Sequence, residues 1–275
     1  MVTLKIGAGE LERHYNEKAK QLLGIARGLS DRPSPEEIHD LRVAARRVQV
    51  MRRLLPRRAR VSQTSKRFDL LLKSTLKQTS QLRDVDTLIS TLEEHRGSLP
   101  SRLLVTLGNQ RSDAAAHAKA ACEVLADSPP PVVDLSEIKG KKLTRRLRKK
   151  AKRHSRAAGQ LLSEVLQDES KVDELHSLRI EVKKLRYLLE LSEKSPRRLA
   201  MVTHWQDSLG AIHDKDVALG FLEEMDLDLK GWALDDLRRS RHRAYLKFVG
   251  ESKADSIEVM GDSGFVTGSA TPLQP

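Results

Sequence analysis

Apolar residues recur every three or four positions along most of the chain, which is the period of amphipathic helices. The stretch 38–55 shows this period most clearly. It follows the tetrapeptide Ser-Pro-Glu-Glu at 34–37, which has the sequence of a capping box with proline at the first helical position. The pattern predicts a helix that begins near Pro35 and stops at Pro56. Its expected buried face consists of Leu41, Ala44, Ala45, Val48 and Met51.

A second stretch, 175–192, repeats the pattern of the first, with leucines and a valine on its apolar face. Each stretch is headed by a histidine, His39 in the first and His176 in the second, and the two lie 137 residues apart. A repeat at this distance indicates a duplicated structural unit.

The other periodic segments divide each half of the chain into about five helices. In the first half we expect helices over 9–29, 59–80 and 100–126, and a helix of about 14 residues opening at Leu82. In the second half we expect them over 136–167, 197–212, 214–225 and 230–249. No segment has the alternation of a β-strand, so the sequence predicts an all-α protein.

Three prolines at 129–131 cannot continue a helix and mark the best boundary in the chain. We therefore expect two helical bundles related by an approximate two-fold, with repeat one at about 9–126, a linker at 127–136 and repeat two at about 137–249. Beyond Gly250 the sequence is rich in Gly, Ser, Thr and Pro, and residues 251–275 are expected to form a disordered tail.

The polar faces of the two histidine-headed helices carry rows of cations with few acids among them. A charged helix face is most often a solvated surface. The nearly pure positive charge, and its repetition, favour a surface that binds an anion instead. The first row consists of His39, Arg42, Arg46 and Arg53, and the second of His176, Arg179, Lys183 and Arg186.

A base followed by Asp-x-Asp also occurs twice, at Arg83-Asp84-Val85-Asp86 and at His213-Asp214-Lys215-Asp216. The acids would suit the first turn of a helix, where they accept from free backbone N–H groups and complement the helix dipole. The base before the first acid suggests a further role, in which a carboxylate holds that base in one rotamer.

Charge narrows the class of partner. The 275 residues have a formal net charge of +12 and a sequence pI of about 9.8, which favours a polyanion. Aromatic residues make up only 3%, which argues against single-stranded nucleic acid, whose bases stack on rings. Cys122 is the only cysteine, so an intramolecular disulfide and a cysteine-based zinc site are excluded. With no signal peptide pattern and no transmembrane-length apolar run, we expect a cytoplasmic protein.

The densest basic run is 141–156, KKLTRRLRKKAKRHSR. Such a run can form a nucleic-acid patch. Because other helices also present bases, we expect it to contribute to a shared groove through the face that carries Lys149 and Arg153. In the first half, Lys77 lies on a face of the expected helix 59–80 and joins the candidate basic residues.

The motif His-x-x-Arg-x-x-x-(Arg/Lys)-(Arg/Lys), followed by a base and Asp-x-Asp and present twice, resembles the CHAD domain family, the conserved histidine α-helical domain. The resemblance covers about 9–249, within a domain of 1–250, and implies two four-helix bundles with pseudo-two-fold symmetry around a basic central cleft. It also implies binding of inorganic polyphosphate and, in some members, association with polyphosphate granules. By the family motif, the cleft would be lined by His39, Arg42, Arg46, Arg83, His176, Arg179, Lys183 and His213.

The chain departs from the family pattern in places. Thr79-Ser80 stands where the family has Leu-Gly, and His213 stands where it has arginine. The Glu-x-Glu-x-Lys signature of the triphosphate-tunnel domain that many relatives carry lacks its lysine at 10–14. The chain therefore resembles a stand-alone member.

From these features we expect non-catalytic binding of polyphosphate, without a cofactor or a metal. The alternative is a nucleic-acid-binding helical protein, because duplex binding depends mainly on backbone contacts. A metal-dependent phosphohydrolase built on the two Asp-x-Asp motifs is less favoured. The neighbouring bases would repel a cation, and the sequence has no P-loop and no Gly-x-Ser-x-Gly.

Overall fold

The computed structural model describes residues 4–96, 101–192, 196–224 and 232–260. Over these ranges the chain forms eight α-helices and one short 3-10 helix, and contains no strand. The all-α prediction is confirmed. The chain divides into two compact units, an N-terminal unit of residues 6–146 and a C-terminal unit of residues 1–5 and 147–275. None of the described helices is long and apolar enough to cross a membrane.

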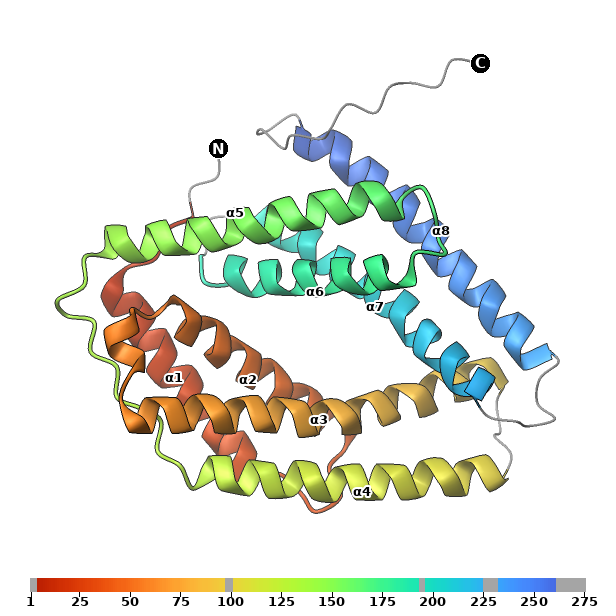
Figure 1. The fold of residues 1–275 in the computed structure, drawn as a ribbon, viewed down its shortest axis with the longest axis horizontal. Coiled ribbons are helices and arrows are strands. Elements are labelled where there is room, and N and C mark those ends of the chain that lie inside the picture. Colours follow the sequence, from red (N-terminus) through yellow and green to blue (C-terminus); the bar gives the residue numbers. More distant parts are fainter. Residues whose placement is uncertain (1–3, 97–100, 193–195, 225–231, 261–275) are drawn as a thin grey trace. The chain divides into compact units, whose positions relative to one another are not determined.

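The N-terminal unit is a four-helix bundle of α1 (Ala8–Arg27), α2 (Pro35–Leu54), α3 (Gln63–Arg96) and α4 (Ser101–Ala126), with the 3-10 helix η1 (Arg57–Arg60) after α2. Contacts run from α1 to α2, from α2 to α3, from α3 to α4 and back from α4 to α1, so the four helices enclose one core (Figure 1). Fully buried side chains of that core include Leu11, Tyr15, Leu22, Ile38 and Leu41.

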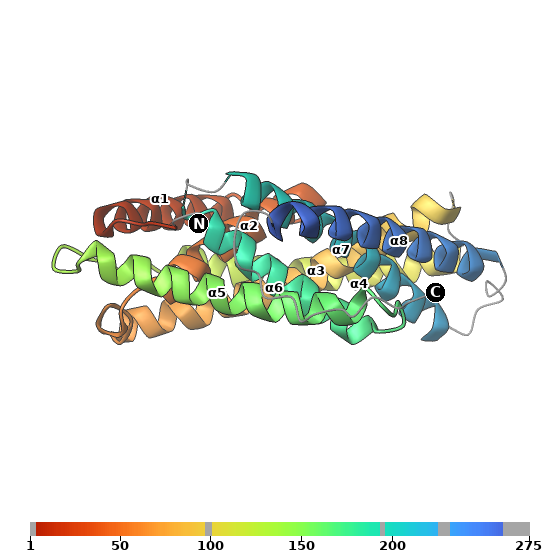
Figure 2. The ribbon, with the colours of Figure 1, turned by 90° about the horizontal axis from the view of Figure 1, so that it is seen from above.

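The C-terminal unit contains most of α5 (Gly140–Val165), with α6 (Val172–Leu189), α7 (Pro196–Glu224) and α8 (Trp232–Met260). Helix α7 packs between α6 and α8, and α7 and α8 lie side by side in both views (Figure 1, Figure 2). The division between the two units falls inside α5, between Arg146 and Leu147, beyond the predicted linker at 127–136. The predicted two-fold relation between the halves and the basic cleft between them stay predictions.

The predicted start of the first histidine-headed helix is confirmed. The Ser34 hydroxyl accepts from the Glu37 backbone N–H at 3.2 Å, and the Glu37 carboxylate accepts from the Ser34 N–H at 2.8 Å. Pro35 occupies the first helical position. This reciprocal cap satisfies two N–H groups that the first turn leaves without helical partners, which is why the sequence located the helix so well.

The predicted helix breaks at Leu82 and at Asp214 are wrong. Helix α3 runs unbroken from Gln63 to Arg96, and α7 runs unbroken from Pro196 to Glu224, so the described residues of each half form four α-helices rather than five. Both Asp-x-Asp motifs therefore lie inside helices, where their acids cannot cap a helix start. Their second acids are instead bonded to arginines of the following helices.

The predicted disordered tail is wrong for residues 251–260, because α8 continues past Gly250 to Met260. Glu251 explains the continuation: its carboxylate accepts from the Ser208 hydroxyl at 3.0 Å and pairs with His204 at 2.9 Å, both on α7. Ser252 beside it is fully buried. Residues 261–275 lie outside the described residues.

Candidate functional site

In the N-terminal unit, Arg42 reaches from α2 across to α3. Its Nη1 donates to the Leu76 carbonyl at 3.1 Å and to Thr79 Oγ1 at 3.2 Å, and its Nη2 lies 3.4 Å from Ser80 Oγ. Thr79 and Ser80 are the pair that replaces Leu-Gly of the family pattern. Thr79 and Ser80 therefore supply two hydroxyls that hold the guanidinium of Arg42, which Leu and Gly at these positions would not.

The other predicted residues of this unit lie along the same pair of helices. His39, Arg53 and Lys77 are exposed, and Arg46 is half-buried and donates from Nη1 to Gln49 Oε1 at 3.1 Å. Arg83 is half-buried. The contacts of Arg42 with α3 fall on either side of Lys77, so the structure brings Arg42 to the segment of α3 that carries Lys77. Arg83 follows on the same helix, about one turn beyond Thr79. Arg53 is about 16 Å further along α2 at 1.5 Å per residue.

In the C-terminal unit, His176 of α6 and His213 of α7 face each other. Their Nδ1 atoms lie 3.3 Å apart and their ring centroids 4.8 Å apart. Burial, together with the positive charges of Arg179 and Lys183 and the second imidazole, lowers the pKa of His213 to about 4. Four predicted residues thus meet at one place, and His213 is uncharged at neutral pH.

Arg186 does not extend this row as a free cation. Its Nε donates to Glu190 Oε1 at 2.9 Å, and its guanidinium lies over the Tyr187 ring, 5.3 Å from the centroid. Both partners of the ion pair are mostly buried, with 17% of each side chain exposed. A carboxylate therefore already occupies the position that a phosphate oxygen would take.

Helix α5 has one buried face and one basic face. Leu143, Leu147 and Ala151 are buried, as predicted. Lys149 and Arg153 are exposed, and the other bases on that side are exposed as well, so the structure does not single out these two. The exposed bases between 141 and 156 are Lys141, Lys142, Arg145, Arg148, Lys149, Lys152, Arg153 and Arg156.

His154 lies on the buried side of α5 and was not predicted to matter. Its Nδ1 is 2.6 Å from Glu181 Oε2 on α6, and its Nε2 is 3.3 Å from Arg153 Nη2. Burial lowers the pKa of this imidazole despite the carboxylate beside it. The contact between His154 and Glu181 joins α5 to α6. The predicted site residue Arg153 lies beside it, through its contact with His154.

Sequence reasoning missed three arginines that the fold uses internally. Arg111 of α4 bonds Asp86 of α3 at 2.7 Å, and Arg241 of α8 bonds Asp216 of α7 at 2.9 Å. The available signal was their spacing, since each arginine follows its aspartate by 25 residues. Arg52 is the third: it is 2% exposed, bonds Asp69 and donates to Ser65 Oγ at 2.7 Å. Nothing in the sequence separates Arg52 from its exposed neighbour Arg53.

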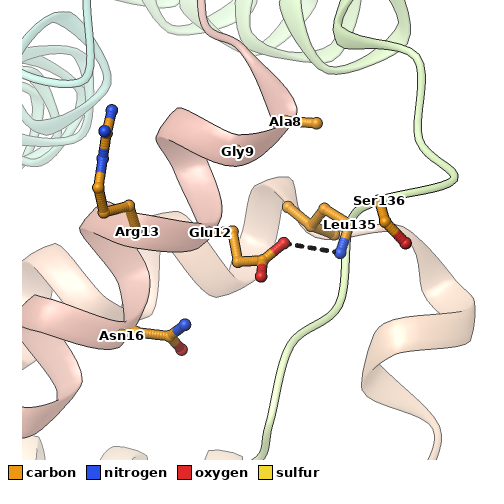
Figure 3. Close-up of a pocket in the computed structure, with 7 residues that line it drawn as sticks. All are labelled: Ala8, Gly9, Glu12, Arg13, Asn16, Leu135 and Ser136. Atoms are coloured by element: carbon orange, nitrogen blue, oxygen red, sulfur yellow. Dashed lines mark hydrogen bonds between the residues drawn. The ribbon is translucent and has the colours of Figure 1, made fainter.

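A cavity of about 510 Å³ opens in the N-terminal unit, between the start of α1 and the segment before α5 (Figure 3). The Glu12 carboxylate in it accepts from the Leu135 backbone N–H at 2.9 Å, while the Arg13 side chain points away from Glu12. None of the predicted site residues lines this cavity. Its lining consists of Ala8, Gly9, Glu12, Arg13, Asn16, Leu135 and Ser136.

No group of three or more His, Cys, Asp or Glu within the described ranges is arranged to hold a metal ion. The second acid of each Asp-x-Asp motif is bonded to an arginine. Apart from Lys149 and Arg153 of α5, the predicted cations come from α2 and α3 in one unit and from α6 and α7 in the other.

Comparison with known proteins agrees with the fold. No curated protein matches the chain. The crystal structure of the CHAD domain from the plant Ricinus communis matches with a TM-score of 0.51 and 18% sequence identity, over 90% of this chain and 88% of that chain. At this identity the likeness shows the fold alone. The family model of the CHAD domain matches residues 11–223, which is most of the chain, and this protein therefore belongs to the CHAD domain family.

Proposed function

We propose that this protein binds inorganic polyphosphate through the cations of its two histidine-headed helices. The observation that carries the proposal is the cluster of His176, Arg179, Lys183 and His213 in the C-terminal unit. Every charged group that acts on His213 there is a base, and together they lower its pKa. A site that gathers four basic side chains suits an anionic ligand, which would offset the repulsion between the charged ones.

The chemistry of the cations favours a phosphate polymer over other anions. Polyphosphate carries about one negative charge per phosphate and has no nucleobases, so a protein recognises it through its phosphate oxygens alone. An arginine fork matches phosphate oxygens, lysine adds a point charge, and histidine becomes a stronger donor once protonated. The CHAD family resemblance implies the same ligand. With aromatic residues at 3%, stacking on bases contributes little.

Duplex nucleic acid is the second candidate, because the exposed basic face of α5 suits backbone phosphates. A competition measurement separates the two. At physiological salt, long-chain polyphosphate should displace labelled duplex DNA or RNA at an equal concentration of phosphate, while the reverse displacement should be weak. Affinity should fall steeply with salt as counterions are released. Equal competition by DNA would contradict the polyphosphate proposal.

We propose binding without turnover, and association with polyphosphate granules as its cellular setting. The second acids of the Asp-x-Asp motifs, Asp86 and Asp216, are bonded to arginines, so a metal would have to displace a guanidinium to use them. Incubation with polyphosphate and Mg²⁺ or Mn²⁺ should release no orthophosphate above the background. Release that disappears in Asp84→Ala or Asp214→Ala would overturn this part of the proposal.

A further inference from the structure

One guanidinium in the N-terminal unit joins three elements. Arg111 of α4 donates from Nε to Asp86 Oδ1 of α3, at 2.7 Å, and from Nη2 to the Pro33 carbonyl, also at 2.7 Å. Pro33 lies just before α2, which begins at Pro35. The guanidinium of Arg111 therefore connects the segment that leads into α2 with Asp86 of α3.

The C-terminal unit repeats this arrangement. Arg241 of α8 donates from Nε to Asp216 Oδ1 of α7, at 2.9 Å, and from Nη2 to the Glu169 carbonyl, at 2.8 Å. Glu169 lies in the segment that leads into α6, which begins at Val172. The same two nitrogens thus bond the same kinds of partner in both units, with the same 25-residue spacing between acid and arginine.

The element held in each case is the start of a histidine-headed helix. Counted from Pro35 and from Val172, His39 and His176 are each the fifth residue of their helix. The side chains of Arg111 and Asp86 are 27% and 2% exposed, and those of Arg241 and Asp216 are 10% and 13% exposed. Bonds between groups so shielded from water restrict movement more than surface ion pairs do.

We propose that Arg111 and Arg241 are positioning residues, which fix the start of α2 and α6 so that His39 and His176 are set for a phosphate. The inference rests on the proposed function. It gives the second acid of each Asp-x-Asp motif a role, which is to hold the arginine. In the C-terminal unit the bond between Arg241 and Asp216 also acts on the second histidine, because Asp216 lies about one helical turn after His213 on α7. Arg241 thereby fixes both imidazoles of the pair relative to each other.

Lysine in place of these arginines tests the role without changing the charge. An ammonium can keep the ion pair with the buried carboxylate, but it cannot span the carboxylate and the carbonyl as the planar fork does. The matched control is Arg67→Lys with Arg243→Lys, because both arginines are exposed and have no partner among the described residues.

We expect Arg111→Lys with Arg241→Lys to lose about tenfold in affinity for long-chain polyphosphate, which equals about 1.4 kcal/mol, while the control pair binds like the wild type. In the single variant Arg241→Lys, NMR titration of the histidines should show the pKa of His213 rising from about 4 toward its ordinary value of 6.5 as the pair loosens.

A lower melting temperature with unchanged affinity and an unchanged His213 titration would overturn the proposal, since a purely stabilising role predicts that result. If the paired variant does not fold, Arg241→Lys alone answers the question, because it leaves the N-terminal unit intact. A wild-type protein that binds no polyphosphate would refute the proposed function instead, and the titration would still test the positioning of the imidazoles.

Discussion

The predicted cations differ in how far the protein itself restrains them. Arg42 is held by the hydroxyls and a carbonyl of α3, and Arg186 is held by Glu190. Lys77 and Arg53 are exposed and have no partner among the described residues. A restrained guanidinium loses less conformational entropy when it binds a ligand, so Arg42 should contribute more per residue than either exposed base.

The lowered pKa of His213 links folding to pH. The folded protein binds a proton at this imidazole only near pH 4, whereas the unfolded chain binds it near pH 6.5. The unfolded state therefore holds more protons between these values, and the free energy of unfolding should rise as the pH is raised from about 4 to about 6.5. Urea unfolding of the wild type and of His213→Gln measures this directly.

His154 acts in the same direction, because burial also lowers its pKa. The test therefore compares how steeply the free energy of unfolding changes with pH in the wild type and in His213→Gln, because the slope of the wild type alone contains both histidines. The slope should be shallower in His213→Gln over this range of pH, and two identical slopes would contradict the lowered pKa of the half-buried His213.

At the scale of the helix, the sequence predicted what local chemistry determines. The capping box at Ser34 and Glu37 placed the start of α2 correctly, because both partners lie within one turn. The breaks predicted at Leu82 and Asp214 failed because Asp-x-Asp resembles a helix start. The arginines that satisfy Asp86 and Asp216 lie 25 residues away, and only the tertiary structure brings them there.

The same limit applies to charged side chains. A helical period places Arg52 and Arg53 side by side, yet one is buried against Asp69 and Ser65 and the other is exposed. Burial of a cation depends on which groups a neighbouring helix offers. The rows of site residues could be predicted as helix faces, whereas the partners that restrain Arg42 and Arg186 could not.

Helix α5 gives a prediction of its own. The sequence suggested that Lys149 and Arg153 matter more than their neighbours, but Arg145 and Lys152 are exposed as well. We expect Arg145→Gln with Lys152→Gln to weaken polyphosphate binding by the same factor as Lys149→Gln with Arg153→Gln, within about twofold, or about 0.4 kcal/mol. Binding isotherms at two salt concentrations measure both. A tenfold greater loss of affinity in Lys149→Gln with Arg153→Gln would support the original prediction that these two residues matter more than their neighbours.

The whole molecule carries a net charge of +12, enough to attract any polyanion over the range of a Debye length. The account therefore depends on whether the histidine-headed rows do more than add charge. Long-range attraction depends on the total charge and is reduced by salt. The proposed bonds from Arg42 and Arg179 to phosphate oxygens would depend on position, and they would be lost only when those side chains are removed.

The most direct test compares two double variants of equal charge, Arg42→Ala with Arg179→Ala, and Arg57→Ala with Arg67→Ala. Arg57 and Arg67 are exposed and have no partner among the described residues, whereas Arg58 pairs with Glu137 and would be a poorer control. Thermal unfolding of both is needed alongside, because Arg42 also bonds α3.

Isothermal titration with long-chain polyphosphate at about 0.15 M salt then gives the result. Each charge-assisted contact contributes about 1.5–3 kcal/mol, so the first variant should lose about 3–6 kcal/mol if the two contacts are independent. The second should lose about 1 kcal/mol or less, because screening acts over about 8 Å. If both variants are folded and lose affinity equally, binding depends on net charge alone, and the histidine-headed helices have no special part in it.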